Sequence, residues 1–293
     1  MTANDQRTIG LDRPVRLEWL DAVAGRLASG DSPKAARQYA WSLLEGVVAG
    51  ETAQTARGKT LTVLGRVWLT PPAPAASLRD SALIRIAQAS AEERLAIHWA
   101  MLCATYPFFV DVSSLIGKSL GLHGEVALSQ LMRRLVDVWG DRSTLRPAAQ
   151  RLIRSMVHWG VLRDSDKVGF FRAPSQMVAI SPVISELLLE GLLVGMQRGM
   201  SLGQLVSHPA LFPFNVRTDV TALRRNERLR VHRQGDQTDY VEREERPPHS
   251  KEPTKNTVPG RADKKSPTTA PGRKRRSGAQ QLPLLSKLPR GAD

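Results

Sequence analysis

The sequence predicts a mainly α-helical protein, with a helical N-terminal module, a winged helix-turn-helix module that includes a small β-hairpin, and a disordered basic tail. Three observations predict this fold class. Apolar residues recur at helical spacing through the first 160 residues. Two short β-type segments then follow a helix with a polar face. The last 47 residues have no aromatic residue and carry eleven basic against three acidic side chains.

These patterns divide the chain into four parts. An N-terminal helical module covers residues 1–72, and the winged-helix module covers residues 78–200. A C-terminal extension with a short helix and a hairpin covers residues 201–246. The disordered basic tail covers residues 247–293, because its composition cannot bury enough apolar surface to offset the entropy of ordering.

Three helices are expected in the first module. Apolar residues at helical spacing predict the first from Trp19 to Leu27, and Gly30 ends it. Ser32-Pro33 is typical of a helix start and opens the second helix, which ends near Gly50. The third runs roughly over residues 55–69, with Arg57, Lys59 and Arg66 on faces turned away from the core. The run Pro71-Pro72-Ala73-Pro74 then breaks the pattern.

The second module begins with helices of the same kind. Ser90 and Glu93 form a capping-box pattern at the start of a helix that reaches Thr105. Further helices are expected over about 109–120 and 125–139, separated by the turn Gly121–Gly124.

The most informative stretch is the helix predicted over Leu145–Trp159, for which Ser143 or Thr144 supplies the N-cap. Its apolar residues share one face. Arg146, Gln150 and Arg154 stand at successive i+4 steps on the other face, and Arg151 and His158 flank them. A hairpin follows, with strands at Val161–Leu162 and Val168–Arg172. This order is typical of a winged helix-turn-helix, whose polar helix can enter the DNA major groove. The alternative is that the same fold mediates protein contacts.

Beyond the hairpin the signals are weaker. The sequence predicts a strand at 178–181, a helix over 182–198, a short helix near 218–224 and a hairpin over 229–241. No internal repeat is evident in the sequence.

The distribution of charge predicts a polyanionic partner. The formal net charge is +14, of which the tail carries +8 and residues 1–246 carry +6. Lys264–Lys265 and Arg273–Arg276 form basic clusters, which favour nucleic acid. The alternative is that the excess charge only keeps the protein soluble.

Several kinds of chemistry are not supported. Gly58-Lys59-Thr60 and Gly117-Lys118-Ser119 imitate a phosphate-binding loop, but neither has a glycine five positions earlier. The six histidines form no i, i+4 pair, so no metal site is expected. Cys103 lies among apolar helix positions and is expected to be inert. We expect no catalysis and no cofactor. No signal peptide or bilayer-length apolar stretch is found, which predicts a cytoplasmic protein with no membrane partner.

Two segments resemble a known family. Trp99–Phe108 is similar to the "W-x-x-x-C-x-x-Y-P-F" stretch of the BrxA family of BREX phage-defence systems. Arg142–Thr144, together with the helix that ends at His158–Leu162, resembles that family's "S-x-T…G-L-L" segment. The resemblance covers roughly residues 15–200. It implies a small helical protein with winged-helix modules that binds double-stranded DNA with weak sequence preference, beside a methyltransferase and an ATPase. Residues 201–241 and the tail depart from the family and receive nothing from it.

The sequence therefore predicts a non-enzymatic, double-stranded DNA-binding component of a BREX-type defence system. The alternatives are a protein–protein adaptor within the defence complex, whose tail alone meets DNA, and a winged-helix transcriptional regulator of its own operon. The first module and the wing would touch phosphate through Arg57, Lys59, Lys167 and Arg172. The helix over 145–159 would face the groove through Arg146, Gln150, Arg151 and Arg154. This helix is preceded by Arg142, Ser143 and Thr144, which complete the set of predicted DNA-facing residues.

Overall fold

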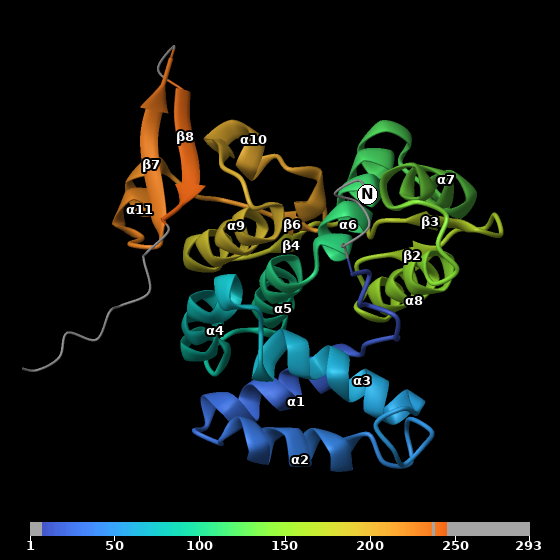
Figure 1. Ribbon diagram of the computed structural model, residues 1–293. Helices are drawn as coiled ribbons and strands as arrows, with labels where there is room; N and C mark the ends of the chain where they lie inside the picture. Colours follow the sequence, from blue (N-terminus) through green and yellow to red (C-terminus); the bar gives the residue numbers. More distant parts are fainter. Residues whose placement is uncertain (1–7, 236–237, 245–293) are drawn as a thin grey trace, which may run out of the picture. The chain divides into compact units, whose positions relative to one another are not determined.

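Helices form most of the molecule, as the periodicity predicts, and the mainly helical fold class is confirmed. The computed structural model describes residues 8–235 and 238–244, so the predicted tail at 247–293 lies outside the described residues (Figure 1). The first elements are α1 (Leu17–Ala28), α2 (Pro33–Leu43), α3 (Ala56–Leu64) and a π-helical turn, η2 (Gly65–Leu69). The hydroxyl of Ser32 accepts a hydrogen bond from Ala35 N, which confirms the predicted cap of α2.

The proline-rich break is shorter than expected. Helix α4 (Ala73–Ile86) starts directly after Pro72. Pro74 lies in its first turn, where a proline fits because no amide donor is needed there. Helix α4 packs against α1, α5 and α9. The N-terminal helices are thereby joined to the rest, and the described residues belong to one compact unit.

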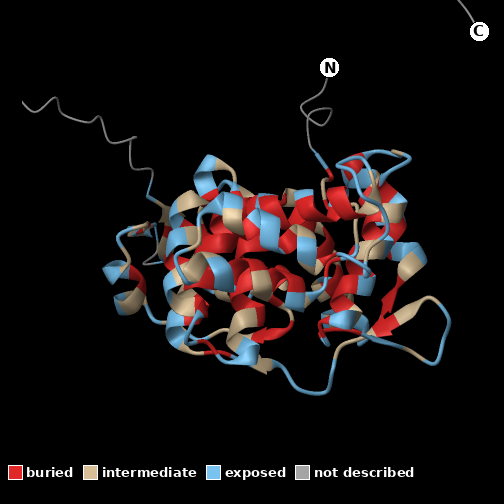
Figure 2. Ribbon diagram, turned by 90° about the horizontal axis from the view of Figure 1, so that it is seen from below, coloured by how far each residue is buried: buried red, intermediate tan, exposed pale blue. Residues whose placement is uncertain are grey.

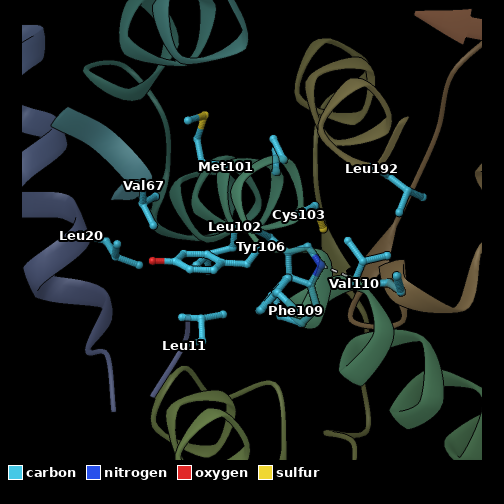
Figure 3. Packing of buried hydrophobic residues seen from close by; sticks show 14 of the residues in the cluster. Leu11, Leu20, Val67, Met101, Leu102, Cys103, Tyr106, Phe109, Val110 and Leu192 are labelled. Atoms are coloured by element: carbon cyan, nitrogen blue, oxygen red, sulfur yellow. Dashed lines mark hydrogen bonds between the residues drawn. The ribbon is translucent and has the colours of Figure 1, made fainter. Parts of the chain in front are cut away.

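Helix α5 (Ala91–Thr105) lies at the centre of this unit. Ser90 and Glu93 make the predicted capping box, and every residue from Leu95 to Tyr106 is buried. Helix α6 (Pro107–His123) then turns away by 119°. Figure 3 shows the Tyr106 ring pointing toward Leu20 between Val67 and Leu11. The turn between α5 and α6 therefore packs in one core with residues that are distant in the sequence.

Trp99 is a second meeting point in the core. Its ring lies edge-on to those of Phe109, Trp159, Phe212 and Phe214, with centroids 4.8–6.2 Å apart. Its indole Nε1 donates to Ala210 O at 3.0 Å. The buried residues gather on the helices in the middle of the unit (Figure 2).

Helix α9 (Pro182–Met196) packs directly on α5, backbone against backbone. A Cβ atom added to Gly191 would lie 2.4 Å from Ala100 O, and one added to Gly195 would lie 2.1 Å from Cys103 O. Both positions therefore require glycine, because any larger side chain would push the two helices apart.

A small antiparallel sheet follows α6. It comprises β1 (Val126–Ala127), β2 (Arg163–Asp164) and β3 (Phe170–Arg172), in the order β1-β3-β2. Helices α7 (Leu128–Trp139) and α8 (Leu145–His158) lie between β1 and β2 in the chain. The sequence places residues 126–127 in a helix, but they pair with β3 instead. The first hairpin strand begins at Arg163 rather than Val161, because Val161 and Leu162 are buried and both donate to Met156 O.

A second three-stranded sheet follows α9, in the order β5-β8-β7. Its strands are β5 (Met200–Ser201), β7 (Leu229–Gln234) and β8 (Thr238–Arg243), and between β5 and β7 lie α10 (Leu202–Val206) and α11 (Val220–Arg225). Between α10 and α11 the chain forms η3 (Pro209–Leu211) and β6 (Phe214–Asn215), which pairs in parallel with β4 (Val178–Ala179). Apart from η3 and β6, the same order of elements thus occurs after α6 and after α9, although the sequence shows no evident repeat.

Candidate nucleic-acid interface

Helix α8 presents a polar face to solvent because its apolar face enters the core. Leu145, Ala149, Leu152, Ile153 and Met156 are all buried, as their spacing predicts. On the opposite side, Arg146, Gln150 and Arg154 are exposed. The three side chains that the sequence places on one line therefore do lie together on one surface.

One flank of α8 is covered by the N-terminal strap, which we define as residues 9–16. The Val15 amide donates to the Ser155 hydroxyl at 2.9 Å, and the Trp159 indole donates to Val15 O at 2.9 Å. Arg151 belongs to this contact. It is half-buried, and its guanidinium donates to Asp12 O at 2.9 Å. The predicted groove-facing position of Arg151 is therefore wrong, because the strap occupies that side of the helix.

The exposed arginines of α8 have acidic neighbours. Arg154 forms an ion pair with Asp164 on β2 at 2.9 Å, and its guanidinium lies over the Phe171 ring. Arg146 lies 3.8 Å from Asp141. In both pairs the side chains are more than half exposed. Surface pairs of this kind contribute about 0–1 kcal/mol, so a phosphate group can replace the carboxylate at little cost.

The turn before α8 contains the remaining predicted residues of this helix. Ser143 and Thr144 are exposed and Arg142 is half-buried. Thr144 occupies the N-cap position with an α-type backbone and makes no capping hydrogen bond through its side chain, nor is one recorded for Ser143 among the described residues. The predicted N-cap position is therefore confirmed at Thr144, but the capping hydrogen bond is not formed. The hydroxyl groups face solvent beside the start of α8.

Two side chains of the β2–β3 hairpin that are predicted to touch phosphate share one carboxylate partner. Lys167 Nζ and Arg172 Nη2 each lie 3.4 Å from a different oxygen of Glu125, which directly precedes β1. Arg172 also lies 3.9 Å from Asp166. The hairpin is thereby tied to the start of the β1–α7 segment, and both cations remain partly exposed.

Three further arginines belong to this surface and are missed by the sequence reasoning. Arg133 and Arg134 are exposed on α7, and Arg163 is exposed on β2 opposite Arg172. Within residues 8–235 and 238–244, none of these three forms an ion pair. The amphipathic pattern of residues 125–139 contains the signal for Arg133 and Arg134, since the apolar set leaves both on the outer face.

The two predicted phosphate contacts of the first module have different environments. Lys59 is exposed on α3. Arg57 is only 5% exposed: its Nε donates to Trp41 O at 2.9 Å, its Nη2 pairs with Glu45 at 3.2 Å, and it stacks 4.1 Å over the Trp41 ring. The predicted exposure of Arg57 is wrong, because these partners on and after α2 bind its Nε and Nη2 and cover one face of its guanidinium group.

The sites set aside in the sequence analysis can also be located. Gly58-Lys59-Thr60 lies within α3 and Gly117-Lys118-Ser119 within α6, so neither forms a loop around a phosphate. Cys103 is buried, and burial raises the pKa of its thiol. Across the described part of the chain, no group of three or more His, Cys, Asp or Glu side chains could hold a metal ion.

Within the described ranges, no single helix has the length and apolar character needed to cross a membrane. The bent pair α5–α6 meets the criteria only when both helices are taken together, and most of α5 is buried in the core.

The comparisons with known proteins add no further constraint. No known protein family, no curated protein and no solved structure matches the chain.

Proposed function

We propose that the protein binds double-stranded DNA without catalysing a reaction, and that residues 107–172 act as a winged helix-turn-helix. The observation that carries this proposal is the sheet order β1-β3-β2 around the α7–α8 pair, with the polar face of α8 exposed. In this architecture the second helix of the pair enters the major groove, while the hairpin contacts the backbone. Arg146, Gln150 and Arg154 would then meet the groove.

The charges around α8 support a duplex as the partner. Exposed or partly exposed cations come from three elements: Arg133 and Arg134 on α7, Arg146 and Arg154 on α8, and Arg163, Lys167 and Arg172 on the hairpin. Phosphate contacts of this kind supply affinity without sequence information. Gln150 is the single amide on the exposed line of α8, so base readout would be limited and sequence preference weak.

The cellular role in this proposal is a component of a BREX-type defence system in the cytoplasm, beside a methyltransferase and an ATPase. Its support is the resemblance of Trp99–Phe108 and of the segment around α8 to the BrxA family. The structure gives a physical reason for part of that pattern, since Trp99, Cys103 and Tyr106 are core residues. An adaptor or an operon regulator would use the same module, and the neighbouring genes distinguish these roles.

The test of DNA binding is the double variant Arg146→Glu/Arg154→Glu in the full chain. We expect weaker binding to a duplex and a slope of log affinity against log salt that falls by about 0.9 for each lost phosphate contact. The matched control is Lys34→Glu/Arg37→Glu, which makes the same charge change at exposed positions on α2.

Circular dichroism establishes that both variants fold. Arg146→Lys/Arg154→Lys should retain binding, because a lysine can replace an arginine at a phosphate. If the folded α8 double-Glu variant binds DNA as well as the α2 control does, α8 is not the DNA surface and the adaptor interpretation replaces this one.

A further inference from the structure

We propose that residues 182–243 are a second copy of the architecture of residues 107–172, and that their arginine-rich surface binds a second DNA duplex. The protein would then hold two duplex segments at once. This inference rests on the proposed function of the first copy. Its starting point is the equivalence of the two sheets, in each of which the last strand lies between the other two.

The pairing of the strands agrees in register. In the first copy, Phe171 of the central strand stands opposite Val126 and Asp164. In the second copy, Val241 stands opposite Met200 and Val231. Each sheet therefore joins a two-residue first strand and a hairpin through one buried apolar residue of the central strand.

Details outside the sheets agree as well. Helices α6 and α9 both have a proline in the first turn, Pro107 and Pro182, and both end at a residue in the left-handed region. A Leu-x-Gln-Leu sequence then follows the first strand in each copy, as residues 128–131 and 202–205. These agreements involve capping, strand register and side chains independently, which favours a repeated unit over coincidence.

The second copy differs from the first in the lengths of its second helix and of its hairpin. Helix α11 has 6 residues where α8 has 14, whereas β7 and β8 have 6 residues each where β2 and β3 have 2 and 3. The additional residues between α10 and α11 return to the core, where Phe212 and Phe214 pack on Trp99. The long hairpin is therefore the most prominent element of this copy.

Positive charge is concentrated on α11 and β7. Residues 217–233 contain six arginines and two acidic residues. Arg217, Arg225, Arg230 and Arg233 are exposed and form no ion pair with any described residue. The acidic side chains of β8 are engaged locally, since Asp239 pairs with Arg224 at 3.3 Å and Glu242 lies 3.7 Å from His232. Unpaired guanidinium groups on this scale suit the phosphates of a nucleic-acid backbone.

The two copies face different directions. Figure 1 shows α8 and α11 on opposite sides of the unit, with the central helices between them. Duplex DNA has a persistence length of about 500 Å and resists bending around a body of this size. Two separate duplex segments are therefore the partners that fit the two surfaces.

The experiment is a capture assay with the full chain. A duplex fixed to beads binds the protein, and a second, fluorescent duplex is retained only when one protein holds both. We expect the wild type to retain the second duplex. Arg225→Glu/Arg233→Glu should keep binding to the fixed duplex but lower retention of the second by about tenfold or more. Arg225→Lys/Arg233→Lys should retain it, and Lys34→Glu/Arg37→Glu controls for total charge.

The possible results distinguish a failure of the second site from a failure of the function proposed for the first copy. Equal retention by the Arg225→Glu/Arg233→Glu variant and the α2 control overturns the second site, as does a wild type that binds one duplex and never retains another. Neither result affects the first copy. A failure of the proposed function instead appears if Arg146→Glu/Arg154→Glu, introduced into the Arg225→Glu/Arg233→Glu variant, leaves binding to the fixed duplex unchanged. Circular dichroism of every variant establishes that the fold is intact.

Discussion

The two copies of the repeated architecture expose different parts. In residues 107–172, helix α8 has 14 residues and one apolar face, so its polar residues lie at the surface. In residues 182–243, the equivalent helix α11 has only 6 residues, of which Leu223 is buried, whereas each strand of the hairpin has 6. The lengths of this helix and of the hairpin, rather than the order of elements, therefore decide which part a copy presents.

The largest expected effect comes from separating α9 from α5. The double variant Gly191→Ala/Gly195→Ala places two methyl groups against backbone carbonyls at distances that no relaxed structure tolerates. Overpacking of this kind costs about 2 kcal/mol at each site, so we expect the free energy of unfolding to fall by about 4 kcal/mol or more. Urea denaturation measures the change.

The matched control is Gly121→Ala/Gly203→Ala. Both glycines are helical and exposed, and an added Cβ atom has nothing within 4 Å at either position. This variant should gain up to about 1 kcal/mol, because alanine favours a helix more than glycine does. Equal denaturation midpoints for the two double variants would contradict the close α5–α9 packing.

An intermediate effect is expected from the acidic residue that ties each copy together. Glu190 on α9 is completely buried, and its two carboxylate oxygens share the single N–H of Arg228 Nε, at 2.8 and 2.9 Å. Glu190→Ala should destabilise the protein by about 3 kcal/mol, because it leaves a partly buried guanidinium group without its partner. Glu125→Ala removes the carboxylate that holds the hairpin of the first copy, whose partners are partly exposed, and should cost less than about 1 kcal/mol.

Thermal and urea unfolding of both variants give this difference directly. A similar loss for Glu125→Ala and Glu190→Ala would mean that the first copy depends on its surface ion pairs as much as the second depends on its buried one.

The smallest effect is the loss of stability at low pH, which depends on two histidines, the half-buried His208 in the second copy and the buried His98 on α5. Burial, with Lys118 and Arg198 nearby, lowers the pKa of His208 to about 4. Burial also lowers the pKa of His98, against the opposing hydrogen bond to Asp21. Because the unfolded chain binds these protons more readily, stability is complete above about pH 6.5 and is lost as the pH falls toward 4.

The measurement is the melting temperature between pH 7.5 and 4. His208→Asn should lose less stability over this range than the parent chain, since Asn does not take up the proton. His158→Asn replaces an exposed histidine on α8 and should follow the parent curve. A parallel curve for His208→Asn would show that the acid sensitivity has another origin.

Local patterns predict the helices of this protein well. Those with a single apolar face or a capping residue, such as the helix capped by Ser32 and the one capped by Ser90, are found where the periodicity places them. The exposed line Arg146–Gln150–Arg154 is predicted for the same reason. These features depend on residues within about one or two turns of each other.

The remaining features depend on contacts between distant residues. Strands β1 and β5 have two residues each, which is too short for any alternation, and they exist only because β3 and β8 pair with them. Arg57 and Arg151 have the same helical spacing as exposed cations, but α2 and the N-terminal strap provide their partners. The repeated architecture is hidden because its agreement lies mainly in topology.

The N-terminal strap also has a consequence for how the chain folds during synthesis. Val15 makes its hydrogen bonds to residues 140 and 144 positions later in the chain. At about 5–20 residues per second, a ribosome releases the strap roughly 7–30 s before its binding surface on α8 exists. Ile9, Leu11 and Val15, which are buried in the final structure, must wait exposed for that time. A segment synthesised before all the described helices is consequently among the last to reach its place, and contacts of such long range slow the final folding step.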